Sequence, residues 1–375
     1  MISGIDHLSK TPITIETEEG KIKRISQESS SKKVILPGLY DIQINGYVGV
    51  DFNSETLSSL DMEKAVKALA KQGVTSFMPT IITNSKEAIE KRLRFLLGFK
   101  KQNQWGSFIS GFHLEGPFIS LEDGPRGAHP KEFVTKPDWS LIEDLQEACE
   151  RNIKIITLSP EWPGTLDVIE KCVKAGIKVA IGHTAANTQE IIEAAQSGAT
   201  LSTHLGNGAH PVLPRHPNYI WDQLANDNLW VTLIADGFHL PKSVISVFLK
   251  VKKDKAILVS DAVSFAGCAP GIYESLIGGQ VELTKEGRLQ MVSDPRLLAG
   301  SASSLLQTIE FMVKSGLATF EEAWEMASIR PAEYLEGKKG RCFSVGSPAD
   351  LVLGHFDGDK FILDSVVKQG KILEI

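Results

Sequence analysis

The sequence is poor in cysteine and has no long apolar run. Its 375 residues include four scattered cysteines (149, 172, 268 and 342) and no Cys-x-x-Cys pair. This argues against a disulfide framework or a zinc–thiolate site and favours a reducing, cytoplasmic compartment. With no apolar stretch of ~18 residues and no signal-peptide core, we expect no membrane span. The net charge of -6 argues against a nucleic-acid partner.

A dinucleotide-binding fingerprint is also missing, because no Gly-x-Gly-x-x-Gly motif follows the first candidate barrel strand. What the chain does contain is ordinary for a soluble globular enzyme, with 42% hydrophobic and 23% charged residues. Its length suffices for one large barrel or for two domains.

From residue 37 onward, apolar runs alternate with helix-length segments. Segments such as 62–73, 141–152 and 188–198 are expected to be helical, and 305–328 is expected to be a core-facing helix. Repeated strand–helix alternation predicts a parallel α/β sheet, and eight repeats favour a closed (β/α)₈ barrel over an open sheet. The eight candidate strands are 38–44, 76–81, 108–115, 154–160, 178–183, 199–204, 230–236 and 256–261.

Both ends of the chain return to a β pattern. Residues 13–25 predict a hairpin that turns near Gly20, and 346–356 and 360–375 read as strands. We therefore expect a small β subdomain made from 1–36 and 340–375, flanking a barrel domain of residues 37–339.

Four segments carry the chemistry, and each is an apolar run that ends in one polar residue followed by small residues. They are GFHLEGPF (111–118), VAIGHTAA (179–186), ATLSTHLGNGAH (199–210) and AILVSDAVSFAG (256–267). The carboxyl ends of barrel strands converge on one face, so Glu115, His183, His204 and Asp261 are expected to meet there. Two imidazoles and a carboxylate suit a metal ion, and a further Asp could move a proton of water.

Each of these residues also has an ordinary structural reading. A histidine at a strand end is often only hydrogen-bonded, and a carboxylate such as Glu115 can simply be solvated where a loop begins. Asp261 could cap a following helix, since aspartate is a good N-cap residue. Taken one at a time, the residues leave these alternatives open.

The ordered set PGLYDIQING, HLEGPF, GHT, THLGNGAH, DGFHL, SDA, AGS and GSPADLVL resembles the amidohydrolase superfamily. Within it, HLEGPF together with THLxN and DGxH resembles the N-acetylglucosamine-6-phosphate deacetylase family. The resemblance spans about residues 34–355. It implies a metal-dependent hydrolase that deacetylates N-acetyl-D-glucosamine 6-phosphate to glucosamine 6-phosphate and acetate, with Asp261 as the general base and acid toward a metal-activated water.

One departure from the superfamily bears on the metal count. Many members have His-x-His at the end of the first barrel strand, whereas this chain has Gln43 and Asn45. Amides are poor Zn²⁺ ligands, and the strand at 154–160 has no lysine at its tip to bridge two metals. We therefore expect one divalent ion per chain, held by Glu115, His183 and His204. Zn²⁺ is the first choice, and Fe²⁺, Mn²⁺ or Co²⁺ are alternatives.

The resemblance also assigns the remaining site residues. His129 is expected to assist Asp261 in catalysis, and Arg215 is expected to pair with the phosphate. The segment Asn207-Gly208-Ala209-His210 departs from the Asn-Ala-Met usual in the family and leaves the local contacts open. The expected substrate contacts are Gln43, Ala128, His129, Asn207, Gly208, Arg215, Asp236, His239, Leu298, Ala299, Gly300 and Ser301.

Two rival functions remain. The chain could hydrolyse another N-acyl amino sugar or an N-acyl amino acid, which the departure after Asn207 motivates. It could also be a catalytically inactive family member that only binds its ligand, against which stand the four intact residues Glu115, His183, His204 and Asp261. A homodimer is expected from the resemblance, with a phosphorylated amino sugar as the small-molecule partner.

Overall fold

The computed structural model describes residues 1–375 except 28–30, 276–278, 338–342 and 374–375, so Cys342 lies outside the described residues. Its main body is an eight-stranded parallel sheet, which confirms the predicted barrel. In pairing order the strands are β5 (Leu39–Ile44), β8 (Val74–Ile82), β9 (Phe112–Glu115), β10 (Ile153–Leu158), β11 (Lys178–Ile181), β12 (Ala199–Ser202), β13 (Trp230–Leu233) and β14 (Ala256–Leu258).

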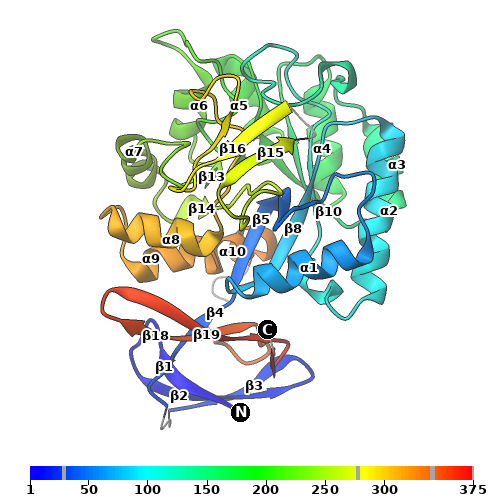
Figure 1. Ribbon diagram of the computed structural model, residues 1–375. Helices are drawn as coiled ribbons and strands as arrows, with labels where there is room; N and C mark the ends of the chain where they lie inside the picture. The colour runs from blue at the N-terminus through cyan, green and yellow to red at the C-terminus, as the bar shows by residue number, and fades with distance from the viewer. Residues whose placement is uncertain (28–30, 276–278, 338–342, 374–375) are drawn as a thin grey trace.

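Helices surround this sheet (Figure 1). Several start where the sequence offers a reciprocal capping pair, such as Ser58 with Asp61 and Asn187 with Glu190. The helices are α1 (Ser59–Ala70), α2 (Lys86–Gln102), α3 (Trp139–Ala148), α4 (Thr165–Lys174), α5 (Thr188–Gln196), α6 (Tyr219–Ala225), α7 (Lys242–Lys252), α8 (Leu305–Lys314), α9 (Phe320–Met326) and α10 (Ile329–Glu336), with short 3-10 turns η1 (Gly106–Phe108), η2 (Lys131–Phe133) and η3 (Lys253–Lys255).

The single helix expected over 305–328 is wrong, because the structure divides it into α8 and α9. Gly316 adopts a φ of 65°, which ends the first helix. Thr319 then caps the second by accepting a hydrogen bond from the backbone of Glu322. The apolar sides of both helices nevertheless face the core as expected, since Ile309 and Met312 of α8 and Trp324 of α9 are buried.

The barrel is closed between β5 and β14 by bonds at the strand tips rather than by a regular ladder. The backbone N–H of Asp261 donates to the carbonyl of Gln43 at 2.9 Å, and the N–H of Asn45 donates to Ala262 at 2.8 Å. Below them, the buried carboxylate of Asp41 accepts hydrogen bonds from the hydroxyl and backbone of Ser260. The segment that carries Asp261 is therefore fixed against the first strand of the barrel.

Inside the barrel, side chains stack in layers that follow the two-residue period of the strands. The lower layer is apolar and includes Ile42, Met78, Ile155, Ala180 and Leu201, all buried, with Ala332 and Tyr334 of α10 closing it from below. Two residues further along three of these strands come Thr157, Gly182 and Thr203. The interior thus changes from apolar to polar toward the carboxyl ends of the strands.

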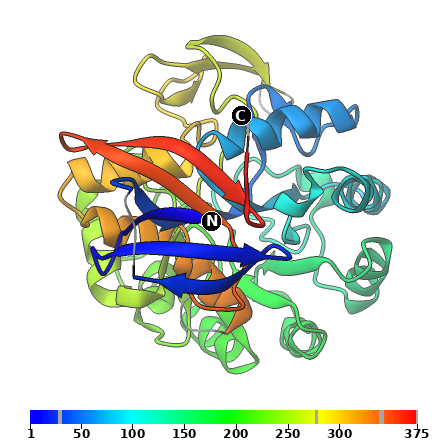
Figure 2. The same cartoon turned by 90° about the horizontal axis from the view of Figure 1, so that it is seen from below.

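The two ends of the chain build a second, seven-stranded sheet, as the sequence predicted. Figures 1 and 2 show it at the amino-terminal end of the barrel, where β4 leads into β5, with both chain termini in it. The precise division at residues 36 and 340 stays a prediction. In pairing order its strands are β20 (Lys371–Ile372), β19 (Lys360–Lys368), β18 (Leu351–Asp357), β4 (Val34–Pro37), β1 (Ile2–Asp6), β2 (Pro12–Glu18) and β3 (Lys21–Ser26).

A third, three-stranded antiparallel sheet follows Asp261 and was not predicted. It consists of β15 (Gly271–Ser275), β16 (Gly279–Leu283) and β17 (Leu289–Met291), and it lies on the far side of the barrel from the terminal sheet (Figure 1). A short hairpin, β6 (Gly46–Tyr47) with β7 (Val50–Asp51), follows β5. In the part of the chain that is described, no helix is long and apolar enough to cross a membrane.

Candidate active site

The four residues singled out from the sequence all lie at the carboxyl ends of barrel strands. Glu115 is the last residue of β9, His183 and His204 come two residues after β11 and β12, and Asp261 comes three residues after β14. The backbone turns sharply at three of them, with φ values of 50° at His183, 29° at His204 and 44° at Asp261. Such left-handed backbone at a residue other than glycine is costly and is concentrated at functional sites.

Three ligand atoms converge at these tips. Glu115 Oε1 lies 3.2 Å from His183 Nε2 and 3.0 Å from His204 Nε2, and the two Nε2 atoms are 3.1 Å apart. A tetrahedral Zn²⁺ with bonds of ~2.0–2.1 Å has ligand atoms ~3.3 Å apart, so the triangle has the size that such an ion requires. Among the described residues, this is the cluster of His, Cys, Asp and Glu side chains that could hold a metal.

The tautomer of His183 is consistent with a metal site. Its Nδ1 lies 2.8 Å from the carbonyl oxygen of Pro125, which can only accept a hydrogen bond, so Nδ1 carries the proton. In the neutral ring, Nε2 then directs a lone pair at Glu115 and His204. The lone pairs of His183 Nε2 and Glu115 Oε1 face one another at 3.2 Å and repel, and a cation between them removes that repulsion, so these residues fit a divalent metal.

Charge inside the site follows from burial. Burial by itself raises the pKa of Glu115, but positive charge at the two ring nitrogens 3.0–3.2 Å away outweighs it and holds that pKa well below its usual range. A divalent cation among the three atoms supplies such charge when both rings are neutral. Gln43, which is fully buried, donates from Nε2 to Glu115 Oε1 at 2.9 Å. Gln43 therefore orients the carboxylate and does not line the pocket.

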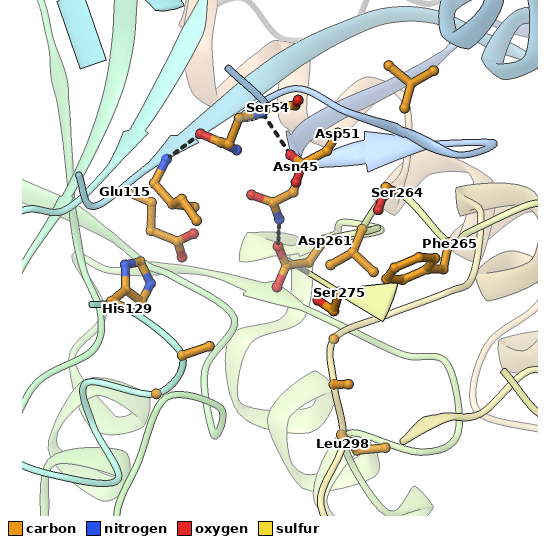
Figure 3. Close-up of a pocket in the computed structure, with 18 of the residues that line it drawn as sticks. Asn45, Asp51, Ser54, Glu115, His129, Asp261, Ser264, Phe265, Ser275 and Leu298 are labelled. Atoms are coloured by element: carbon orange, nitrogen blue, oxygen red, sulfur yellow. Dashed lines mark hydrogen bonds between the residues drawn. The ribbon is translucent and has the colours of Figure 1, made fainter. Parts of the chain in front are cut away.

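Asp261 faces the same space from the opposite side. Its Oδ1 accepts a hydrogen bond of 2.7 Å from Nδ2 of Asn45, as Figure 3 shows. Burial, followed by the negative charge of Glu115, raises the pKa of Asp261 to about 6. Asp261 does not cap a helix, because the residues after it form turns that lead to β15. A carboxylate with a raised pKa, held by one oxygen, is suited to proton transfer.

Two further histidines stand around this centre. His129 is buried, its Nδ1 lies 2.8 Å from the hydroxyl of Thr83, and its ring packs edge-on against His183 with 4.5 Å between centroids. Burial lowers the pKa of His129 to about 3, so the ring is neutral. His239 is held through Nδ1 by Asp236 at 2.7 Å, which leaves its other nitrogen for a ligand.

The pocket around the cluster has a volume of about 820 Å³. Of the predicted substrate contacts, Ala128, His129, Asn207, Gly208, His239, Leu298, Ala299 and Gly300 line it. Gln43, Asp236, Arg215 and Ser301 do not. Gln43 and Asp236 instead hold Glu115 and His239 from behind, Ser301 is buried in a β-bridge with Ala262, and Arg215 is exposed on its loop.

Several lining residues were not predicted from the sequence. Asp51 of β7 and Asn53 just after it line the pocket, and so do Glu274, Ser275 and Met291 of the three-stranded sheet. Figure 3 shows Asp51 and Ser275 at different parts of the lining. Alternating residues around the Gly278-Gly279 pair were a usable hairpin signal for β15 and β16. Nothing in the sequence indicated that they reach the pocket.

A parallel barrel with a Glu–His–His cluster and a buried Asp at its strand tips defines a class, the metal-dependent hydrolase barrels. The amidohydrolase family model matches residues 34–373. N-acetylglucosamine-6-phosphate deacetylase from Bacillus subtilis is 33% identical over 356 residues, which is 90% of this chain and 88% of that protein. The mouse enzyme of that name is 32% identical, covering 87% of this chain and 81% of its own length.

Solved structures agree. The N-acetylglucosamine-6-phosphate deacetylase of Thermotoga maritima superposes with a TM-score of 0.82 at 27% identity, covering 99% of this chain and 98% of that one. The chain therefore belongs to the amidohydrolase family, and within it to the N-acetylglucosamine-6-phosphate deacetylase family. The resemblance inferred from the sequence motifs is thus confirmed.

Proposed function

We propose that this protein is a metal-dependent deacetylase that hydrolyses N-acetyl-D-glucosamine 6-phosphate to glucosamine 6-phosphate and acetate. The observation that carries the proposal is the triangle of Glu115, His183 and His204 ligand atoms, with Asp261 beside it in one pocket. The names of the relatives supply the substrate. The expected homodimer and cytoplasmic location stay predictions.

Glu115, His183 and His204 would hold one divalent ion, which we propose to be Zn²⁺. When bound, such an ion lowers the pKa of a water molecule to near ~7 and polarises a carbonyl oxygen. The fixed tautomer of His183 keeps its Nε2 lone pair directed at the site, and Gln43 keeps the Glu115 carboxylate in place. The ligand atoms of His183 and Glu115 are therefore already oriented for a metal ion before it binds.

Asp261 is the proposed proton carrier. Its Oδ1 is occupied by Asn45, so Oδ2 is the oxygen that would take a proton from the attacking water. The water oxygen adds to the acetyl carbon, the carbon–nitrogen bond breaks, and Asp261 returns the proton to the leaving nitrogen. The carboxylate is thus regenerated, and the products are the free amine and acetic acid, which releases the second proton of the water to become acetate.

His129 is the proposed stabiliser of the carbonyl oxygen. When the Thr83 hydroxyl donates to Nδ1, the neutral ring carries its proton on Nε2 and can donate it toward the pocket. Such a donor stabilises the negative charge that develops as water adds. His239, Asn207 and the loop 298–300, all on the pocket surface, are proposed to orient the sugar.

One observation keeps a second candidate open, the hydrolysis of an unphosphorylated N-acyl amino sugar. Among the described residues, those that line the pocket include no lysine or arginine to pair with a phosphate. Arg215, the residue predicted for that role, lies outside the lining. The phosphate contact of Arg215 therefore stays a prediction.

A parallel assay separates the two candidates. Acetate release by Zn²⁺-loaded protein would be measured on N-acetylglucosamine 6-phosphate and on N-acetylglucosamine at equal concentrations. A strong preference for the phosphorylated sugar is the expected result. Equal rates on both would favour the second candidate, and no release from either would contradict deacetylation.

A further inference from the structure

A chain of hydrogen bonds runs through the barrel directly beneath the three proposed metal ligands. His113 Nδ1 lies 3.1 Å from the carbonyl oxygen of Ile42, and His113 Nε2 lies 2.7 Å from the hydroxyl of Thr157. The Thr157 hydroxyl in turn lies 2.7 Å from that of Thr203. All three side chains are at most 3% exposed. We call Ile42, His113, Thr157 and Thr203 the His113 network.

The donors and acceptors in this network can be assigned without ambiguity. The Ile42 carbonyl only accepts, so His113 Nδ1 carries a proton, and in the neutral ring His113 Nε2 accepts from Thr157. The Thr157 hydroxyl has then used its single proton, so Thr203 donates to it. The bonds run in one direction across the barrel, from Thr203 to Ile42, and every polar atom on the path has a partner.

Three of the four members adjoin a residue of the metal site in sequence, and the fourth, Thr157, pairs with Glu115 in the β9–β10 ladder. Thr203 directly precedes His204, His113 is two residues before Glu115 on the same face of β9, and Ile42 directly precedes Gln43, which holds Glu115. Three barrel strands that carry parts of the site, β5, β9 and β12, are therefore joined at one level through Thr157 of β10.

The remaining ligand, His183, is coupled through the glycine before it. Strand β11 lies between β10 and β12, so the bond from Thr203 to Thr157 spans the position of Gly182. A Cβ atom at Gly182 would lie 2.8 Å from Thr157 Cγ2 and 2.8 Å from Thr203 Cβ, closer than real Cβ contacts come. Gly182 is thus the residue that lets the two hydroxyls meet across β11.

We propose that His113, Thr157, Thr203 and Gly182 are positioning residues that set the spacing of the metal ligands. They touch neither ion nor substrate, and they act by fixing the relative heights of the strand tips that carry Glu115, His183 and His204. The proposal rests on the proposed metal site. The proposal goes beyond that site because residues that are not metal ligands would determine how tightly the ion binds.

The test measures Zn²⁺ affinity of the purified full chain by competition with a chromophoric chelator, which requires no turnover. Thr157→Val removes the central hydroxyl at nearly constant volume and should weaken Zn²⁺ binding by roughly 10-fold or more, as loss of support around a metal site does. Thr157→Ser restores the hydroxyl and should bind nearly as the parent does. Gly182→Ala should weaken binding as Thr157→Val does, although it removes no polar group.

Thr200→Val is the matched control. Thr200 lies on β12, three residues before Thr203, and its hydroxyl bonds to that of Tyr334 at 3.0 Å, away from the network. This variant should keep the parent affinity. The proposal is overturned if Thr157→Val binds Zn²⁺ like the parent, or if Thr200→Val weakens binding equally. If Thr157→Val does not fold, Gly182→Ala decides in the same way. A parent chain without Zn²⁺ affinity would instead contradict the metal site itself.

Discussion

The hydrogen bond from Asn45 to Asp261 offers a direct test of the proposed proton carrier. Asn45 Nδ2 donates to Asp261 Oδ1 at 2.7 Å, and this bond stabilises the charged form of the carboxylate. Asn45→Ala removes the donor, so the pKa of Asp261 should rise. A general base acts as the carboxylate, so the acid limb of the pH profile should move to higher pH.

The size of the shift follows from the strength of the bond. A hydrogen bond to a charged group contributes roughly 1.5–3 kcal/mol. Since about 1.4 kcal/mol corresponds to one pKa unit, the acid limb should move up by about 1–2 units. The shift should be near the lower end of this range if a water molecule replaces Asn45 as the hydrogen-bond donor. Activity should therefore fall most in mildly acidic buffer and approach that of the parent in alkaline buffer.

The assay is kcat/KM for acetate release across pH, with bound metal measured in parallel. Asn53→Ala is the control, because Asn53 also lines the pocket but bonds to the backbone of Thr80 and Ile82. It should leave the limb in place. If Asn45→Ala has normal metal content and the acid limb of its pH profile does not move, the assignment of that limb to Asp261 is refuted.

Three further outcomes are expected. Asp261→Asn should retain the metal by elemental analysis yet lower kcat by ~10²–10⁴-fold, and near-normal turnover would assign proton transfer elsewhere. His204→Ala should lose ion and activity together, whereas parent protein with two tightly bound ions would contradict the one-metal inference. His7, 1% exposed, has its pKa lowered by burial from 6.5 to about 4, below the unfolded value, so protonation favours unfolding. The contribution of His7 to stability should therefore be full above pH 6.5 and fall by roughly 2–4 kcal/mol toward pH 4, so His7→Leu should reduce the acid-induced loss of stability, measured by denaturant unfolding, by about that amount.

Much of the fold could be predicted because its signals are local. Each barrel strand is an apolar run with a helix-length segment after it, and that alternation repeats eight times. The apolar stripe at 305–328 continues across Gly316 and Thr319, so the stripe by itself predicts one helix where the glycine ends α8 and the threonine begins α9. The three-stranded sheet is an insertion between β14 and α8, and the strand–helix repeat that predicts the barrel gives no signal for it.

The residues of the candidate site likewise fall into those with a local sequence signal and those without one. Glu115, His183, His204 and Asp261 were identifiable because each ends an apolar run, and strand tips of a parallel barrel meet on one face. The roles of Gln43 and Asp236 could not be separated from substrate contact, since a side chain behind the pocket wall and one on its surface look alike in sequence. His113 lies within the HLEGPF motif. Its bonds to Ile42 and Thr157 could not be predicted, because they join strands that are more than 40 residues apart in the sequence.

By itself, the sequence determined which side chains stand at the strand tips, because the period of two residues and the ends of apolar runs are properties of neighbouring residues. The tertiary structure alone decided how far apart those tips lie. The 3.0–3.2 Å spacing of the ligand atoms depends on barrel closure between β5 and β14 and on the hydroxyl bond across Gly182. Such spacing arises from contacts between distant segments, and no local pattern of residues encodes it.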